Sequence, residues 1–309
     1  MTNTQNHPEY EYLNALRQIM EKGERRQTRN AVTRSVFGMR MEFPLYRIEN
    51  GIETSQIPLM TTKKVFWKGV MHELLWFIRG DTNAKHLDKM GVKIWNENSS
   101  RATLDALGLS NYEEGDCGPV YGFQWRHFGA PYGGVDVGVD VGGNIGIDQL
   151  ENCIQQLRND PFSRRIFMSA WNPMDLEAMC LPPCHVSYQF YVSSSEKRLY
   201  CQLYQRSADM FLGVPFNIAS VSLLTHLLAH LVGLKPGGVI LVLGDAHIYE
   251  DHMDVVSQQL ERVPVAPFPS IRIGGDCCIG YEKIEQYRFE DIILENYICE
   301  GALKANMAV

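Results

Sequence analysis

The sequence has no excess of positive charge. It holds 29 lysines and arginines against 36 aspartates and glutamates, which gives a net charge of −7 at neutral pH. A chain with this balance has no general attraction to nucleic acid or to anionic membranes. An anionic ligand would therefore have to be bound by a local cluster of arginines.

Long apolar runs are also missing, and so is an apolar segment at the start. The most apolar stretch, Ile218–Gly233, is interrupted by serine, threonine and histidine, so it predicts a buried helix and not a membrane span. Met1–Glu11 is polar and does not resemble a secretory signal. An even count of eight cysteines does not by itself indicate a disulfide framework in a chain this long. We therefore expect reduced thiols and a cytoplasmic protein, or a nuclear one in a eukaryotic cell.

Three familiar motifs are absent. There is no internal repeat, and the glycine-rich segment Gly133–Gly146 lacks the Lys-Ser/Thr of a phosphate-binding loop, which favours a surface loop. His226 and His230 have helical spacing, but Leu227 stands where a zinc protease has glutamate. We interpret both as core or interface histidines and predict no metal site.

The apolar pattern predicts helices and strands in an irregular order. Expected helices are Pro8–Met20, Val65–Ile78, Asp148–Arg158, a buried helix from about Ile218, and Glu250–Arg262. Expected strands are Val36–Phe43, Arg165–Trp171, His185–Val192, Leu199–Gln205 and Gly238–Leu243, with a polar loop at Glu49–Gln56. Without a regular βα repeat this pattern indicates an α+β fold. No composition break marks a linker, so we expect one domain over residues 1–309.

Cys184 is the candidate nucleophile. It lies in Leu181–His185, where Pro182 and Pro183 fix the backbone just before a predicted strand. A thiolate is a strong nucleophile, and nearby cations favour its formation. The alternative is a structural cysteine, because cysteine is among the most buried residue types.

Several polar residues adjoin the predicted strands. Arg164 and Arg165 precede one strand, and Arg206 with Ser207 ends another, as phosphate binding would require. Solvated surface charge is the alternative. Asn217 opens the buried helix, where it could serve as an N-cap or, through its amide, bind the edge of a uracil.

Long ordered motifs give the chain a family resemblance. They include Leu181–His185, Cys201–Asp209, Leu212–Ser220, Gly244–Tyr249, Thr61–Trp67, Glu73–Phe77, Ile94–Trp95 and Gly118–Trp125. Together they resemble the thymidylate synthase family from the first helix to the carboxyl end. The resemblance implies an α+β fold with a large mixed β-sheet, and a homodimer whose subunits pack sheet to sheet.

The resemblance also implies a reaction. Cys184 would attack C6 of deoxyuridine monophosphate (dUMP), and Asn217 would hold the pyrimidine and stabilise charge at O4. The one-carbon unit and hydride would come from 5,10-methylenetetrahydrofolate, yielding dTMP. Tyr121 would lie near the C5 proton, and Glu73, a desolvated acid with a raised pKa, would organise protons over the folate.

The same resemblance assigns the remaining residues. Catalytic roles fall to Cys184, Glu73, Tyr121, Asn217, Asp209, Arg206 and His185. Binding of dUMP falls to Arg29, Arg164, Arg165, Gln205, Arg206, Ser207, Asn217, His247 and Tyr249, with Arg164 and Arg165 reaching across from the partner subunit. The folate side would comprise Lys63, Phe66, Ile94, Trp95, Asn98, Asp209, Gly213, Phe216, Ala308 and Val309, the last two in a tail that seals the site from water.

The chain departs from the family pattern in its arginine loop. Arg26–Thr33 replaces the usual Asp-Arg-Thr-Gly-x-Gly-Thr and has no glycine, so Arg29 is our choice for the phosphate arginine. Two alternatives stay open. A dUMP or dCMP hydroxymethylase would let water capture the one-carbon adduct, although cytosine-specific relatives carry an acid at the position of Asn217. An RNA-binding regulatory protein is the alternative of another class, disfavoured by the acidic charge.

Overall fold

The computed structural model describes residues 7–29, 31–135, 145–265, 267–274 and 281–307. The chain divides into two compact units, each assembled from separate segments. The first unit comprises Met1–Trp67, Val192–Gly280 and Glu290–Ala308, and the second comprises Lys68–Tyr191 and Tyr281–Phe289, with Val309. The expectation of one domain stays a prediction.

A mixed sheet forms the centre of the first unit. Its strands are β1 (Glu24–Gln27), β2 (Val32–Pro44), β8 (Lys235–Tyr249) and β7 (Arg198–Asp209), adjacent in that order. Strand β2 pairs with β1 and β8 antiparallel, whereas β7 and β8 run parallel. Helices and a mixed sheet therefore combine as the α+β prediction requires.

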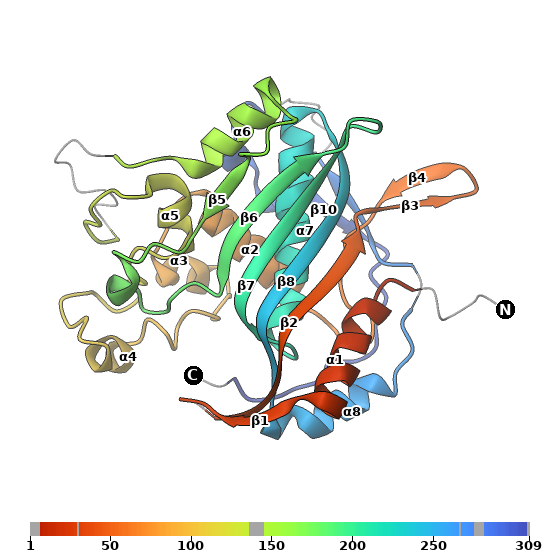
Figure 1. Ribbon diagram of the computed structural model, residues 1–309. Coiled ribbons are helices and arrows are strands. Elements are labelled where there is room, and N and C mark those ends of the chain that lie inside the picture. The colour runs from red at the N-terminus through yellow and green to blue at the C-terminus, as the bar shows by residue number, and fades with distance from the viewer. Residues whose placement is uncertain (1–6, 30, 136–144, 266, 275–280, 308–309) are drawn as a thin grey trace. The chain divides into compact units, whose positions relative to one another are not determined.

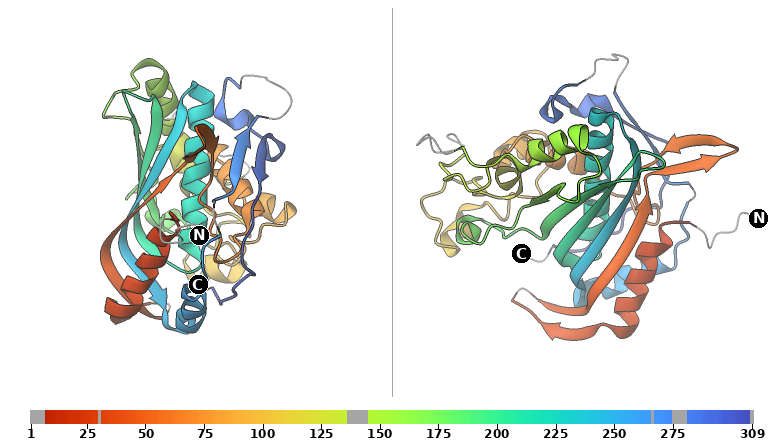
Figure 2. Two further views of the ribbon diagram at one scale, coloured as in Figure 1. Left: turned by 90° about the vertical axis from the view of Figure 1, so that its right-hand side faces the viewer. Right: turned by 45° about the horizontal axis from the view of Figure 1, so that its top comes forward.

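Helices cover this sheet on the side that forms the core. Helix α7 (Gly213–Val232) packs along β7 and β8, and α1 (Tyr10–Lys22) packs on β2 and α8 (Met253–Leu260) (Figures 1 and 2). By length and composition alone α7 could cross a membrane, but 78% of its apolar window is buried. Helix α7 is apolar on all of its faces, as a helix in a protein core is, and the sequence predicted such a buried helix.

Two small hairpin-like sheets complete the first unit. Strands β3 (Tyr46–Glu49) and β4 (Ile52–Ser55) pair antiparallel, as do β9 (Ser270–Ile273) and β10 (Ile292–Glu295). The expected polar loop at Glu49–Gln56 was wrong. Asn50 and Gly51 both have positive φ, 51° and 78°, which is the turn that Asn-Gly favours between two short strands.

The second unit is mainly helical. Its helices are α2 (Trp67–Ile78), α3 (Ala84–Lys89), α4 (Arg101–Ala106), α5 (Tyr121–His127) and α6 (Gln149–Asn159), and its strands are β5 (Phe167–Ser169) and β6 (His185–Val192). Strands β5 and β6 pair antiparallel, and α5, α6 and β5 pack together. The ring of Phe77 lies 4.8 Å from that of Tyr121 and 5.6 Å from that of Trp125, so the core beside α5 is aromatic.

The predicted elements that lie in long patterned segments are confirmed. Strand β6 has the predicted bounds, and α1, α2 and α6 begin within two residues of prediction. Strands β7 and β8 extend further than predicted, because polar residues continue both strands to their carboxyl ends. In contrast, the strand expected at Arg165–Trp171 shortens to the three residues of β5, and the helix from Glu250 begins with a 3-10 turn, Glu250–His252.

Candidate active site

A polar cavity of about 290 Å³ lies in the first unit, where β7 and β8 end. The lining residues come from the β1–β2 turn, from β2 and from the carboxyl ends of β7 and β8. They are Thr28, Arg29, Thr33, Arg206, Ser207, Asp245, His247 and Tyr249. The structure therefore brings together five of the residues predicted to bind dUMP.

Strand geometry explains this gathering. Asp245, His247 and Tyr249 alternate along β8, so their side chains share one face of the sheet. On the neighbouring strand β7, Ser207 is the residue that pairs in register with Asp245 of β8. A side chain at Gly244 would place its Cβ 2.8 Å from the carbonyl oxygen of Arg206, so only glycine allows the strands to approach here.

The turn that carries Arg29 closes without glycine. The backbone N–H of Thr28 donates to the carbonyl oxygen of Ala31 over 3.0 Å, and the Thr28 hydroxyl donates to the same oxygen over 2.7 Å. A threonine side chain thus supports the turn that the family pattern builds with glycines. Arg29 lines the cavity, as predicted.

Charge in the cavity is balanced around Asp245. Arg26 Nη1 lies 2.7 Å from Asp245 Oδ2, and His247 Nδ1 lies 3.3 Å from Asp245 Oδ1. The nearby His247 ring and the Arg26 charge lower the pKa of Asp245 despite its partial burial. The carboxylate is therefore ionised beside a cavity suited to an anion. Neither Arg26 nor Asp245 was predicted; the motif Gly244–Tyr249 contained the signal for Asp245.

Asn217 and Gln205 form a pair in the same unit. The Gln205 amide donates to Asn217 Oδ1 over 2.9 Å and to the carbonyl oxygen of Ser207 over 3.0 Å. Because α7 begins at Gly213, Asn217 lies inside the helix and its interpretation as an N-cap was wrong. Its side chain is instead oriented by a neighbouring strand, and it is only half-buried.

Cys184 and Tyr121 are in direct contact in the second unit. The backbone N–H of Cys184 donates to the Tyr121 hydroxyl over 2.7 Å, and the Tyr121 ring lies 5.6 Å from that of the buried His185. Cys184 itself is half-buried, which suits a nucleophile that a substrate must reach. Burial raises the pKa of Tyr121 well above its usual value, so this phenol stays neutral.

Glu73 lies in the same unit, on α2. Its Oε1 accepts a 2.8 Å hydrogen bond from the Trp95 indole, and the Trp95 ring lies 6.0 Å from that of Tyr121. Desolvation raises the pKa of Glu73 to about 7, although the Trp95 hydrogen bond opposes the rise. A carboxyl group with this pKa can both give and take a proton near neutral pH.

The residues predicted for folate lie in both units. In the first, Asp209 Oδ1 accepts the backbone N–H groups of Phe211 and Leu212 at 3.0 and 3.1 Å, and Gly213 and Phe216 are half-buried on α7. Phe66 is 47% exposed. Lys63 is buried, donates to the carbonyl oxygen of Phe211, and lies 3.7 Å from that ring's centroid. Ile94 and Asn98 of the second unit are half-buried.

Some predicted residues are not part of these groups. Arg164 and Arg165 are exposed in the turn before β5 and do not line the cavity of the first unit. Ala308 and Val309 lie outside the described residues. Buried His226 donates from Nε2 to the carbonyl oxygen of Gln56 over 2.9 Å, as a core histidine would. Among the described residues, no group of three or more His, Cys, Asp and Glu could hold a metal.

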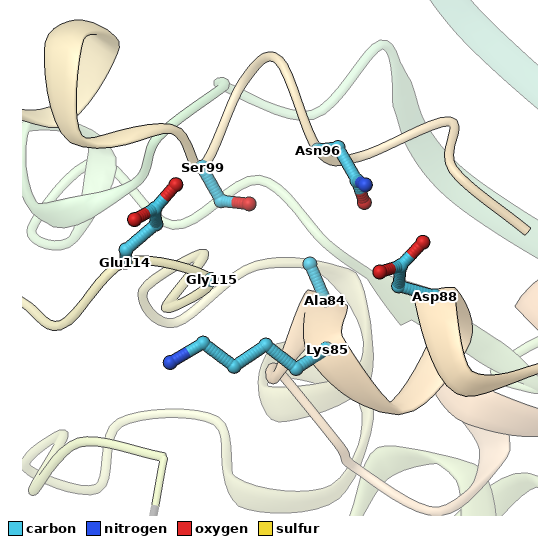
Figure 3. A pocket seen from close by; sticks show the side chains of 7 residues that line it. All are labelled: Ala84, Lys85, Asp88, Asn96, Ser99, Glu114 and Gly115. Atoms are coloured by element: carbon cyan, nitrogen blue, oxygen red, sulfur yellow. The ribbon is translucent and has the colours of Figure 1, made fainter.

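A separate cavity of about 230 Å³ in the second unit contains none of the predicted residues (Figure 3). It lies among α3 and the loops before α4 and α5. Its lining is Ala84, Lys85, Asp88, Asn96, Ser99, Glu114 and Gly115. Charges of both signs line it, so it favours no single class of ligand.

Known proteins resemble nearly the whole chain. The family model described as thymidylate synthase matches residues 10–309. Thymidylate synthase of Homo sapiens is 52% identical over 304 residues, 98% of this chain and 91% of the relative, and that of Equine herpesvirus 2 is 52% identical over 98% and 99%. Bifunctional dihydrofolate reductase-thymidylate synthase 2 of Arabidopsis thaliana is 50% identical over 98% of this chain and 51% of its own length. The chain therefore belongs to the thymidylate synthase family.

Proposed function

We propose that this chain converts dUMP to dTMP with 5,10-methylenetetrahydrofolate. The chain is a methyltransferase of its family, and identity of about one half over 98% of its length supports this activity. The observation that carries the assignment of residues is the polar cavity of the first unit, where two arginines, Ser207, His247 and Tyr249 come together.

The phosphate and ribose of dUMP belong to that cavity. Arg29 and Arg206 offer guanidinium donors that match phosphate oxygens in pairs, and Ser207 adds a hydroxyl. His247 and Tyr249, the next residues on the same face of β8, bind the ribose hydroxyl. Within one chain, the phosphate and ribose contacts thus come from the first unit.

Asn217 binds the pyrimidine edge. Its Oδ1 accepts from Gln205, so the orientation of the amide is fixed before the base arrives. The NH₂ group of that amide donates to O4, where negative charge develops when C6 is attacked. An amide also matches the acceptor at O4 and the donor at N3–H, which favours uracil over cytosine.

Cys184 attacks C6 of the ring as a thiolate. Pro182 and Pro183 restrict the backbone before it, and the hydrogen bond from its own N–H to Tyr121 fixes the residue relative to α5. Attack at C6 makes C5 nucleophilic. The neutral hydroxyl of Tyr121 lies near the position from which the C5 proton leaves, and Glu73, with its pKa of about 7, exchanges protons with water there.

The described residues fit a folate. Asp209 is a carboxylate fixed by two backbone N–H groups, as recognition of a pterin or its amide-like edge requires, and Phe66 exposes an aromatic face. A Cβ at Gly213 would lie 3.5 Å from Asp209 Cβ and 3.6 Å from Asn217 Oδ1, so glycine leaves space beside both side chains. When bound, 5,10-methylenetetrahydrofolate supplies the one-carbon unit and a hydride. Trp95, Ile94 and Phe216 add apolar surface for the folate, and Asn98 adds a polar amide.

The working form is a homodimer in the cytoplasm. Large apolar side chains are exposed on strands of each unit, with Phe37 83% and Tyr191 65% exposed, which supports packing of a second copy. Arg164 and Arg165 are exposed and do not line their own chain's cavity, so we assign them to the phosphate of the partner subunit. Six described cysteines are free thiols, which supports a reducing compartment.

A spectrophotometric assay tests the reaction. Purified protein is incubated with dUMP and 5,10-methylenetetrahydrofolate, and the absorbance of dihydrofolate is followed. Methylation yields dihydrofolate, whereas hydroxymethylation yields tetrahydrofolate. Turnover of dUMP without dihydrofolate would contradict the proposed activity.

Covalent trapping tests the nucleophile. We expect 5-fluoro-dUMP, with folate present, to form an adduct on the peptide that contains Cys184, detected by mass spectrometry. Cys184→Ala should abolish the adduct, and Cys153→Ala, at a buried cysteine of α6, should leave it intact. An adduct on another residue would refute the role of Cys184.

A further inference from the structure

Two buried cysteines outside the proposed chemistry are in contact in the second unit. The backbone N–H of Cys180 donates to the carbonyl oxygen of Cys117 over 3.0 Å. The Cys117 thiol donates to the carbonyl oxygen of Gly115 over 3.9 Å, and Cys180 is close enough to add to the burial that raises the pKa of Cys117. A direct backbone bond of this kind is compatible with the ~4.4–6.8 Å between α-carbons that disulfides span. Both residues are free thiols, with Cys117 fully buried and Cys180 4% exposed.

Each of the two cysteines lies the same number of residues before a residue of the proposed mechanism. Cys117 precedes Tyr121 by four residues, and Cys180 precedes Cys184 by four. The two segments are held at one end by the bond from Cys180 N to Cys117 O and at the other by the bond from Cys184 N to Tyr121 Oη. Pro182 and Pro183 make the connection on one side stiff.

Packing between the two segments is tight. The Tyr112 hydroxyl donates to the carbonyl oxygen of Ala178 over 3.0 Å, and a Cβ at Gly118 would lie 2.0 Å from that same oxygen. Gly118 also has φ of +73°, a conformation that other residues rarely adopt. A change in the separation of residues 117 and 180 cannot be absorbed locally, so it reaches Tyr121 and Cys184.

We propose that Cys117 and Cys180 form a redox-modification site, at which a low-molecular-weight disulfide such as oxidised glutathione converts the dithiol to a disulfide and slows catalysis. Cys180, the more exposed thiol, attacks one sulfur of glutathione disulfide, releases one glutathione and forms a mixed disulfide. Cys117 then attacks the sulfur of Cys180 and releases the second glutathione. The two thiol protons pass to the two glutathione thiolates, so two protein thiols are oxidised and one glutathione disulfide is reduced.

The second step controls the rate. Burial raises the pKa of Cys117 well above its usual value, and the thiolate is the attacking form. We expect oxidation to be slow, on the order of minutes to hours, and to accelerate as the pH rises. In the oxidised protein a sulfur–sulfur bond of about 2 Å joins the two side chains, which draws the two segments together.

Peptide mapping tests the disulfide itself. Reduced, full-length protein is incubated with glutathione disulfide and saturating dUMP, quenched with iodoacetamide, and digested without reductant. We expect a cross-linked peptide pair containing Cys117 and Cys180, lost after dithiothreitol treatment and absent in Cys180→Ala. Loss of thiols without this pair, or a pair joining other cysteines, would overturn the proposal.

Steady-state kinetics tests its effect, which rests on the proposed function. The oxidised protein should show at least a tenfold lower kcat with KM for dUMP changed less than twofold, because the cavity that binds phosphate and ribose lies in the first unit and Arg164 and Arg165 lie outside the two cysteine segments. Dithiothreitol should restore kcat, Cys180→Ala should keep its activity under the same treatment, and Cys153→Ala should lose activity as the parent does. If glutathione disulfide inactivates Cys180→Ala as much as the parent, the Cys117–Cys180 disulfide is not the cause of the lower kcat. Covalent trapping by 5-fluoro-dUMP in the reduced protein separates this failure from failure of the proposed function.

Discussion

Glu73 illustrates how one residue can be costly to stability and useful to chemistry. It is the one acid in the apolar helix α2, and desolvation raises its pKa from 4.5 to about 7. Its proton is bound more tightly in the folded chain than in the unfolded chain. The contribution of the protonated Glu73 carboxyl group to the unfolding free energy is therefore fully present below pH 4.5 and is lost as the pH rises through 7.

Glu73→Gln should remove this pH dependence. A shift of this size corresponds to ~3 kcal/mol, so the gain in unfolding free energy of the variant should grow from near zero at pH 4.5 to about that value at pH 8. Urea denaturation at the two pH values measures it. Activity should fall by roughly 100-fold or more, because glutamine transfers no proton. Exposed Glu97→Gln is the control; a pH-independent difference for Glu73→Gln would contradict the argument.

A second prediction about a single residue concerns Arg26, which neutralises the carboxylate of Asp245. Asp245 is an anion beside the proposed phosphate cavity, and Arg26 is ion-paired to it over 2.7 Å. Arg26→Ala should expose the phosphate to this carboxylate and raise KM for dUMP roughly three- to tenfold, with little change in kcat. The effect should weaken at high salt, because both side chains are partly exposed.

Arg25 offers a matched control for that experiment. It is the neighbouring residue on β1 and pairs with Glu250 over 2.7 Å, and neither residue lines the cavity. Arg25→Ala should leave KM for dUMP within about twofold, since it uncovers no charge beside the phosphate. Steady-state kinetics on both variants decides the matter. Equal increases in KM would show that general loss of positive charge, and not Asp245, is responsible.

At the scale of elements, the side chain of Glu9 connects helix α1 to the segment that begins at Thr61 through hydrogen bonds. Glu9 immediately precedes α1 and is fully buried, and its carboxyl group accepts from the N–H and hydroxyl groups of Thr61 and Thr62 at 2.6–2.9 Å. These threonines begin the segment that carries Lys63 and Phe66, which we assign to folate binding. The position of that segment thus depends on α1.

Glu9→Gln should loosen this connection. An amide replaces one acceptor oxygen with a donor that faces an N–H and a hydroxyl, so the unfolding free energy should fall by about 2–4 kcal/mol. KM for the folate should rise more than KM for dUMP. Chemical denaturation and kinetics measure both effects. Glu11→Gln, on the exposed face of α1, should change neither; a loss of stability there as well would implicate the helix and not the loop.

Elements were predictable where the pattern is long, and less so where polar residues extend them. The alternation of apolar and polar residues predicted the bounds of β6 correctly, and the helical spacing of apolar residues predicted α1, α2 and α6. The same reasoning stopped β8 at Leu243, because Asp245, His247 and Tyr249 interrupt the apolar run, although these residues form the cavity wall. Asn217 was expected at the start of a helix, but α7 begins four residues earlier at Gly213, with Pro215 in its first turn, where a missing N–H costs no helical hydrogen bond.

At the scale of the whole molecule, the family was predicted correctly from its motifs, and the match over residues 10–309 confirms it. Local pattern could not place residues from separate segments around one cavity. Arg26 was missed because its role depends on a partner 219 residues away. Asp245 had a signal in its motif, but its charge balance becomes visible only when β1 and β8 are seen in one sheet.

The assignment of Arg164 and Arg165 to a partner subunit leads to a test that only an oligomer can pass. If two copies exchange these arginines, each site combines Cys184 of one chain with the arginine pair of the other, and two-fold symmetry makes the sites equivalent. Cys184→Ala and Arg164→Ala/Arg165→Ala should each be nearly inactive alone.

Mixed after unfolding and refolding together, the two variants should recover activity. Half of the dimers would contain one copy of each, and in these both defects fall in the same site, so the other site is intact. About one quarter of the parent activity should return, with a KM for dUMP like that of the parent. A refolded mixture of Cys184→Ala with Cys184→Ala/Arg164→Ala/Arg165→Ala is the control and should stay inactive. Failure to recover activity, with dimers verified by light scattering, would place the arginine pair in its own chain's site or outside any site.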